Sequence, residues 1–140
     1  MAKRFKLVVF GKAGCDKCKM LKKRTDELLA SAEWADFEQE YCDVETEEGL
    51  IEFCRSECIN PTRIPALVVM RQQADGAYRP MTVPPPAKPD PLLGKSRLYH
   101  VLGLQTDYSS QGRGVLSPKM IQAVMTAARA AAEEPAGGNE

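Results

Sequence analysis

The chain has 140 residues, no net charge at neutral pH, and hydrophobic and charged fractions of 44% and 27%. This length can bury a core without disulfide or metal staples, so we expect one domain over residues 1–133 and a disordered tail over residues 134–140. The balanced charge argues against nucleic acid or a membrane as partner, and the early apolar run at residues 7–10 is too short for a signal-peptide core or a membrane span. We therefore expect a cytoplasmic protein.

Two strands and a helix are predicted in the first third of the chain. Residues 5–10, FKLVVF, are apolar with almost no alternation, which is typical of a short strand buried on both faces. From Cys15 the apolar residues follow a helical period up to about Ala32, with lysines on the opposite stripe. Residues 37–43, FEQEYCD, alternate in polarity and predict a second strand.

The next predicted elements are a helix and a strand that opens with a proline. Thr46 is a candidate N-cap for a helix that runs to Cys58, and acidic residues in its first turn complement the helix dipole. Residues 64–70, IPALVVM, predict a third strand, because a proline is tolerated at the first residue of a strand.

The last part of the chain is predicted to hold a hairpin, an insertion and a helix. After a turn at residues 74–76, either residues 78–83 or residues 98–104 suit the returning strand. Residues 83–97 are rich in proline and predict a polyproline-like surface insertion. Residues 117–132 begin with Ser-Pro and predict a final helix. This order indicates an α/β domain with a mixed central sheet and helices on both faces.

Five cysteines are an odd set for a reducing compartment, which favours catalysis, metal binding or burial over a full disulfide framework. Cys15 is expected in the turn between the first strand and the first helix, and Cys18 in the first turn of that helix. Backbone N–H groups and the helix dipole stabilise an anion there, and Lys12 and Lys17 add positive charge. This setting favours the thiolate of Cys15, and Cys18 is placed to attack a mixed disulfide formed at Cys15.

The segment from Phe10 to Cys18, FGKAGCDKC, resembles the active-site segment of glutaredoxins and related small redoxins. It shares the strand, a lysine three residues before the first cysteine, and a Cys-x-x-Cys pair that opens a helix. Downstream, Arg63-Ile64-Pro65 and the strand after it are similar to the cis-proline element of that family. The resemblance covers about residues 3–71 and implies a thioredoxin-like fold with thiol–disulfide oxidoreductase activity.

The same resemblance implies a role for each matching residue. Cys15 would be the attacking thiolate and Cys18 the resolving thiol. Lys12 would tune the local charge or contact an anionic substrate. Pro65 would face the dithiol, and the backbone of Ile64 would pair with the extended chain of a substrate. No prosthetic group is implied. The substrate would be a disulfide-containing protein or a small-molecule thiol, and the electrons would come from glutathione or a reductase.

The sequence departs from the family pattern at several points. The residues between the cysteines are Asp16-Lys17, where thioredoxins typically have Gly-Pro and glutaredoxins Pro-Tyr. No tryptophan precedes Cys15, since the sole tryptophan is Trp34. The first strand lacks the buried acid of thioredoxins, and residues 112–114 match the glutathione-holding segment of glutaredoxins only weakly.

Two other classes of function stay open at this point. Cys15, Cys18, Cys54 and Cys58 could supply a four-cysteine zinc site, although the predicted helices place the two pairs on opposite faces of the sheet. Cys15 and Cys18 could also bridge two chains through zinc or an iron–sulfur cluster. Alternatively the domain could bind a partner without catalysis, with the proline-rich insertion as contact surface. We expect Cys54 and Cys58 to be core residues, with a second dithiol as the alternative. We expect Cys42 to be buried in its strand, with a third reactive thiol as the alternative. We expect His100 to be structural rather than a metal ligand.

Overall fold

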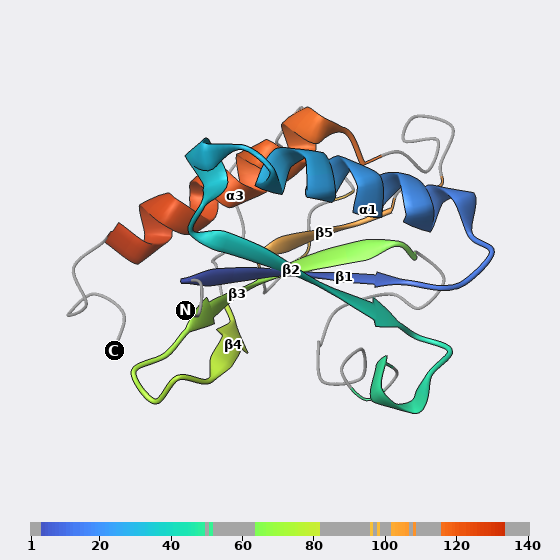
Figure 1. The fold of residues 1–140 in the computed structure, drawn as a ribbon, viewed down its shortest axis with the longest axis horizontal. Helices are drawn as coiled ribbons and strands as arrows, with labels where there is room; N and C mark the ends of the chain where they lie inside the picture. The colour runs from blue at the N-terminus through green and yellow to red at the C-terminus, as the bar shows by residue number, and fades with distance from the viewer. Residues whose placement is uncertain are drawn as a thin grey trace.

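The structure is a computed structural model that describes residues 4–49, 51, 64–81, 96, 98, 102–106, 108 and 116–133. Strands and helices alternate in its first half, and short strands precede a long helix in its second half (Figure 1). In chain order the elements are β1 (Phe5–Gly11), α1 (Asp16–Leu29), the 3₁₀ helix η1 (Ala32–Trp34), β2 (Phe37–Asp43), β3 (Ala66–Gln72), β4 (Tyr78–Pro80), β5 (Gly103–Gln105) and α3 (Pro118–Glu133).

The sheet is mixed, and β1 lies inside it. β1 pairs in parallel with β2 along its whole length, from Phe5 opposite Phe37 to Gly11 opposite Asp43. On its other side β1 pairs antiparallel with β3, where Val8 lies opposite Val68. A strand with neighbours on both sides and packing on both faces must be apolar throughout, which is the pattern that the sequence shows. The predicted mixed central sheet is confirmed.

The outer edge of β3 is shared by two short strands. β4 pairs with the carboxyl-terminal part of β3, and β5 pairs with its amino-terminal part, both antiparallel. The two candidates for the returning strand are therefore both right in part: β4 covers three residues of 78–83, and β5 overlaps 98–104 at Gly103 and Leu104. Between them the chain leaves and re-enters the sheet at one place, because the Leu102 N–H donates to the Met81 carbonyl at 2.8 Å and the Val69 N–H donates to the Leu102 carbonyl at 2.9 Å.

Both α1 and α3 cover the same face of the sheet (Figure 1). The larger core cluster lies between these helices and the sheet, and its fully buried side chains include Phe5, Leu7, Leu67 and Ile121. A smaller cluster lies on the opposite face, around Phe10 and residues of β3. Side chains of β1 alternate between the two clusters, as the period of a strand requires.

The sequence signals for helix starts are confirmed where the structure describes them. The Ser117 hydroxyl accepts the Met120 N–H at 3.3 Å, so serine caps α3 as expected. The Thr46 hydroxyl accepts the Gly49 N–H at 3.1 Å, and residues 47–49 and 51 are helical. The rest of the helix predicted to Cys58 lies outside the described residues, as do the tail at 134–140 and all of the 83–97 insertion except Ser96.

In the part of the chain that the structure describes, no helix is long and apolar enough to cross a membrane.

Candidate active site

The turn between β1 and α1 places Cys15 as the N-cap of the helix. Gly14 has a φ of 75°, a left-handed conformation that glycine adopts without a steric penalty, and this lets the chain turn sharply before the helix. The Cys18 N–H donates to Cys15 Sγ at 3.2 Å, and the Lys19 N–H donates to the Cys15 carbonyl at 3.1 Å. The Cys15 sulfur therefore takes the place that a serine or aspartate oxygen takes in an ordinary cap.

Cys15 and Cys18 are joined by a disulfide, with their Cα atoms 5.2 Å apart. The two residues differ in exposure, because Cys15 is partly exposed while Cys18 is fully buried. Only Cys15 can therefore be reached directly by a bulky substrate. This asymmetry matches the order of attack that the resemblance implies, with Cys15 outside and Cys18 behind it.

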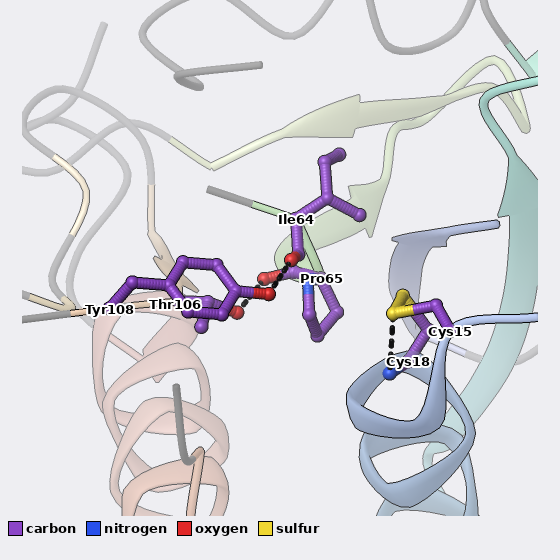
Figure 2. The surroundings of a disulfide bond; sticks show 6 residues. All are labelled: Cys15, Cys18, Ile64, Pro65, Thr106 and Tyr108. Carbon is purple, nitrogen blue, oxygen red and sulfur yellow. Dashed lines mark hydrogen bonds between the residues drawn. A yellow bond between two sulfur atoms is a disulfide. The ribbon is translucent and has the colours of Figure 1, made fainter. Parts of the chain in front are cut away.

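Pro65 lies beside this disulfide at the start of β3 (Figure 2). The Ile64–Pro65 peptide bond is cis, as the resemblance led us to expect. Thr106 holds this segment from the far side. Its N–H donates to the Pro65 carbonyl at 3.1 Å, and its hydroxyl donates to the same oxygen. Because Thr106 directly follows β5, the short strand fixes the position of Pro65 against the disulfide.

Tyr108 completes this side of the site. Its hydroxyl donates to the Ile64 carbonyl, so that Pro65 lies between the tyrosine and the disulfide (Figure 2). Tyr108 is 47% exposed, and Lys17 Nζ lies 5.9 Å from the ring centroid. Partial desolvation raises the pKa of Tyr108 above its ordinary value of 10.0.

A second tyrosine lies next to Cys18. A Cβ atom built on Gly11 would collide with the Tyr41 hydroxyl oxygen and would lie 2.9 Å from Cys18 Cβ. The missing side chain at Gly11 thus makes room for both neighbours. Burial, and to a smaller extent the negative charge of Asp43, raises the pKa of Tyr41. A neutral phenol accordingly borders the buried cysteine, on a strand that carries no buried acid.

A groove of about 210 Å³ runs along α1 from its first turn, between this helix and the segments that carry Pro65 and Leu116. Its wall includes the exposed thioether of Met20 and the Arg24 side chain, which donates to the Leu116 carbonyl at 3.0 Å. The groove is mainly apolar with cationic groups at its rim. The full lining is Asp16, Lys17, Met20, Leu21, Arg24, Pro65 and Leu116.

Four of the five predicted site residues lie together in the structure, and the fifth, Lys12, lies outside this cluster. Cys15, Cys18, Ile64 and Pro65 form one cluster (Figure 2). Lys12 follows β1 directly and is exposed, without an ion pair to any other described residue.

The remaining cysteines and Trp34 lie away from the disulfide wherever the structure describes them. Cys42 is buried among the residues of the smaller cluster, on the sheet face opposite α1, so it is a core thiol as expected. Trp34 is buried in the larger cluster. Cys54, Cys58, His100 and the segment 112–114 lie outside the described residues.

Sequence reasoning missed Tyr41, Thr106 and Tyr108. Thr106 directly follows β5 and Tyr108 follows three residues after its end, so both could have been indicated only by placing that strand beside β3. Tyr41 could have been found from its register, since it lies one residue before Cys42, opposite Val9 on β1.

These features decide the architecture. A strand leads through a cysteine pair into a helix, a parallel strand follows, and a cis-proline opens an antiparallel strand that faces the disulfide. The fold is thioredoxin-like.

Comparison with known proteins adds one structural neighbour. No family model and no curated protein matches the chain. Among solved structures, the chain is similar to the oxidized form of mitochondrial thioredoxin 3 from Saccharomyces cerevisiae, with 21% identity and a TM-score of 0.38. The match covers 55% of this chain and 63% of the thioredoxin, which is less than two thirds of that protein.

Proposed function

We propose that this protein is a thiol–disulfide oxidoreductase that uses Cys15 and Cys18. The observation that carries the proposal is the disulfide at the first turn of α1, which has one partly exposed and one buried cysteine and faces Pro65. The exposed sulfur is open to attack on or by a substrate, and the buried sulfur lies behind it, within bonding distance.

The reaction proceeds in two exchange steps. In the reduced protein the Cys15 thiolate attacks one sulfur of the substrate disulfide, and the other substrate sulfur leaves as a thiolate that takes up a proton. The Cys18 thiolate then attacks Cys15 Sγ, releases the second substrate thiol, and closes the Cys15–Cys18 disulfide. The substrate gains two electrons and two protons, and the protein loses them. An external dithiol or two molecules of a monothiol restore the reduced pair.

Local charge supports the first step. The Cys18 N–H and the helix dipole both stabilise negative charge on Cys15 Sγ, since unpaired N–H groups gather at a helix start. Lys17 is exposed in the same turn, and Lys12 lies just before it. Asp16 adds an opposing charge next to the nucleophile. The cationic groups are more numerous, so they favour the thiolate.

Within this class we favour a glutaredoxin-like type that acts in the cytoplasm. The support for the type is the lysine three residues before Cys15, here Lys12, and the support for the compartment is the count of five cysteines, which cannot all pair as disulfides within one chain. The reductant would be glutathione or a reductase, and the substrate a disulfide-containing protein or a small-molecule thiol.

Metal binding is the alternative function that the cysteine spacing suggests. Among the described residues, no group of three or more histidine, cysteine, aspartate or glutamate side chains is arranged to hold a metal ion. Cys54 and Cys58 lie outside those residues, so the four-cysteine site remains a prediction. Elemental analysis of protein purified without chelator tests it.

The proposal is tested by following the reduction of a model disulfide with Cys15→Ser, Cys18→Ser and Cys42→Ser variants. We expect Cys15→Ser to abolish the activity and Cys18→Ser to accumulate a mixed disulfide at Cys15, visible by mass spectrometry. Cys42→Ser is the matched control, because Cys42 is on the other face of the sheet, and its exchange rate should equal that of the wild type. Full activity in the Cys15→Ser protein would overturn the proposal.

A further inference from the structure

Tyr108 links two parts of the site that are far apart in the sequence. Its hydroxyl donates to the carbonyl of Ile64, the residue before Pro65. Its ring lies within cation–π distance of Lys17, one of the two residues between the cysteines. The side chain therefore reaches from the cis-proline segment toward the first turn of α1, on the same side as Pro65 (Figure 2).

The Ile64 carbonyl is held differently from the carbonyls that follow it. From Ala66 onward the backbone of β3 is paired with β1 and β5, and the Pro65 carbonyl accepts both the N–H and the hydroxyl of Thr106. The Ile64 carbonyl is instead met by the end of a side chain whose residue is 47% exposed.

Such a contact is readily exchanged. An exposed side chain changes rotamer in picoseconds to nanoseconds, and one hydrogen bond of this kind contributes only about 0.5–1.5 kcal/mol net. A backbone carbonyl that loses its partner needs another donor, and a peptide N–H is the closest chemical substitute for the phenol. The residue before a proline is also restricted to extended conformations, which suits pairing with an extended peptide.

We propose that Tyr108 determines specificity, by occupying the Ile64 carbonyl in the free protein and yielding it to a peptide N–H of the substrate. This inference rests on the proposed thiol–disulfide function and names its substrate class, a disulfide carried by an extended polypeptide. A low-molecular-weight disulfide without any N–H or O–H donor cannot take over this acceptor. Lys17 keeps the ring at the site, so the hydroxyl returns when the product leaves.

The substitution Tyr108→Phe separates the hydroxyl from the ring. It removes the competitor for the Ile64 carbonyl and retains the ring that contacts Lys17. Tyr78→Phe is the matched control, because Tyr78 is on β4 opposite Gln72, at the end of β3 away from Pro65, and Lys6 Nζ lies 4.3 Å from its ring centroid. Circular dichroism and urea unfolding show whether both variants keep the fold.

The first measurement is binding without chemistry. A fluorescent extended peptide with serine in place of the reactive cysteine is titrated with wild-type protein, Tyr108→Phe and Tyr78→Phe, and its anisotropy gives Kd. We expect Tyr108→Phe to bind about two- to tenfold more tightly than the wild type, the factor that one net hydrogen bond supplies. Methylating the peptide amide that pairs with Ile64, found by testing each amide in turn, should remove this gain. Tyr78→Phe should bind like the wild type.

The second measurement is single-turnover reduction by the pre-reduced protein. A disulfide-bonded version of the peptide is compared with dimethyl disulfide, which has no N–H or O–H donor. We expect Tyr108→Phe to raise the ratio of the two second-order rate constants in favour of the peptide. The change should lie in the half-saturating concentration rather than in the limiting rate.

Three results would overturn the inference: unchanged or weaker peptide binding in Tyr108→Phe, an equal gain for every methylated peptide, or an equal rate change for both disulfides. The proposed function fails in a different way. In that case the wild-type protein reduces neither disulfide, whatever the binding measurement gives.

Discussion

At its amino end β1 begins with Phe5, which is fully buried and stacks on Phe37 with 4.7 Å between the ring centroids. At its carboxyl end the same strand stops at Gly11, beside the disulfide, where the absence of a side chain makes room for Tyr41 and Cys18. One end of the strand is filled by large aromatic side chains. The other end has no side chain at Gly11 and borders the Cys15–Cys18 disulfide.

The polar groups at the two ends differ in the same way. Near Phe5, Arg129 pairs with Asp36 through two hydrogen bonds, and its guanidinium lies 4.2 Å from the centroid of the Trp34 ring. Near the disulfide, the Ile64 carbonyl depends on the exposed hydroxyl of Tyr108. Side chains at the amino end of β1 therefore contribute mainly to stability, whereas contacts at its carboxyl end are more easily exchanged. Substitutions at the two ends should have separable effects on the free energy of unfolding and on the rate of disulfide exchange.

The largest expected effect is that of Phe5→Ala. Removing this buried ring leaves a cavity beside Phe37 and should lower the free energy of unfolding by about 3–5 kcal/mol. Urea unfolding measures the loss, and the rate of disulfide exchange per folded molecule should stay at the wild-type value. Phe5→Leu, which refills part of the cavity, should lose less. An exchange rate that falls together with stability would break the comparison.

A smaller effect is expected from Gly11→Ala at the other end. The new methyl group would collide with the Tyr41 hydroxyl and crowd Cys18, so the free energy of unfolding should fall by about 1–3 kcal/mol. Unlike Phe5→Ala, this change should also slow the step in which Cys18 resolves the mixed disulfide, as measured by stopped-flow mixing.

The control for Gly11→Ala is Gly76→Ala. Gly76 has a φ of 89° and open space around its Cα, so an alanine there strains the backbone without crowding any neighbour. It should lower stability by about 1 kcal/mol and leave the resolving step unchanged. Equal slowing in both variants would show that Gly11 has no special relation to Cys18.

The smallest effect is that of Arg129→Met, which breaks the pair with Asp36. We expect a loss of about 1 kcal/mol at neutral pH, because both side chains are nearly one-third exposed and solvent screens the pair. The hydrogen bond from Arg129 lowers the pKa of Asp36 below its ordinary value of 3.8. The stabilisation is therefore present above pH 3.8 and is lost as the pH falls through the lowered pKa of the folded state. Urea unfolding of both proteins across this range should show the two stabilities converging, and a difference that grows in acid would contradict the assignment.

Much of the fold follows from the sequence because its signals are local. β2 spans the predicted residues 37–43, and β1 extends the predicted 5–10 by Gly11 alone. Alternation and apolar runs are read over a few residues, and capping hydroxyls lie within one turn of the helix they start. The site cysteines were also found locally, since only two residues separate them.

The parts that sequence reasoning could not supply depend on contacts between distant residues. Arg129 and Asp36 are brought together only by the packing of α3 on the sheet. Tyr108 reaches Ile64 because β5 pairs with β3, and the local sequence pattern does not predict the register of that pairing. The shared outer edge of β3 was not predicted for the same reason. Either returning segment suited the second arm of the hairpin, and the local pattern did not show that both pair with β3.

That shared edge has a consequence for how the chain can vary. Because Met81 and Leu102 are joined by a backbone hydrogen bond, the two ends of the segment between them lie side by side at the sheet. The free energy of closing a loop rises only slowly with its length, by about 0.6 kcal/mol for each doubling. Residues 82–95 can thus vary in length and composition at little cost to the sheet. Leu98 cannot, because its side chain is buried in the smaller core cluster. Changes confined to residues 82–95 should therefore leave the position of Cys15 unchanged.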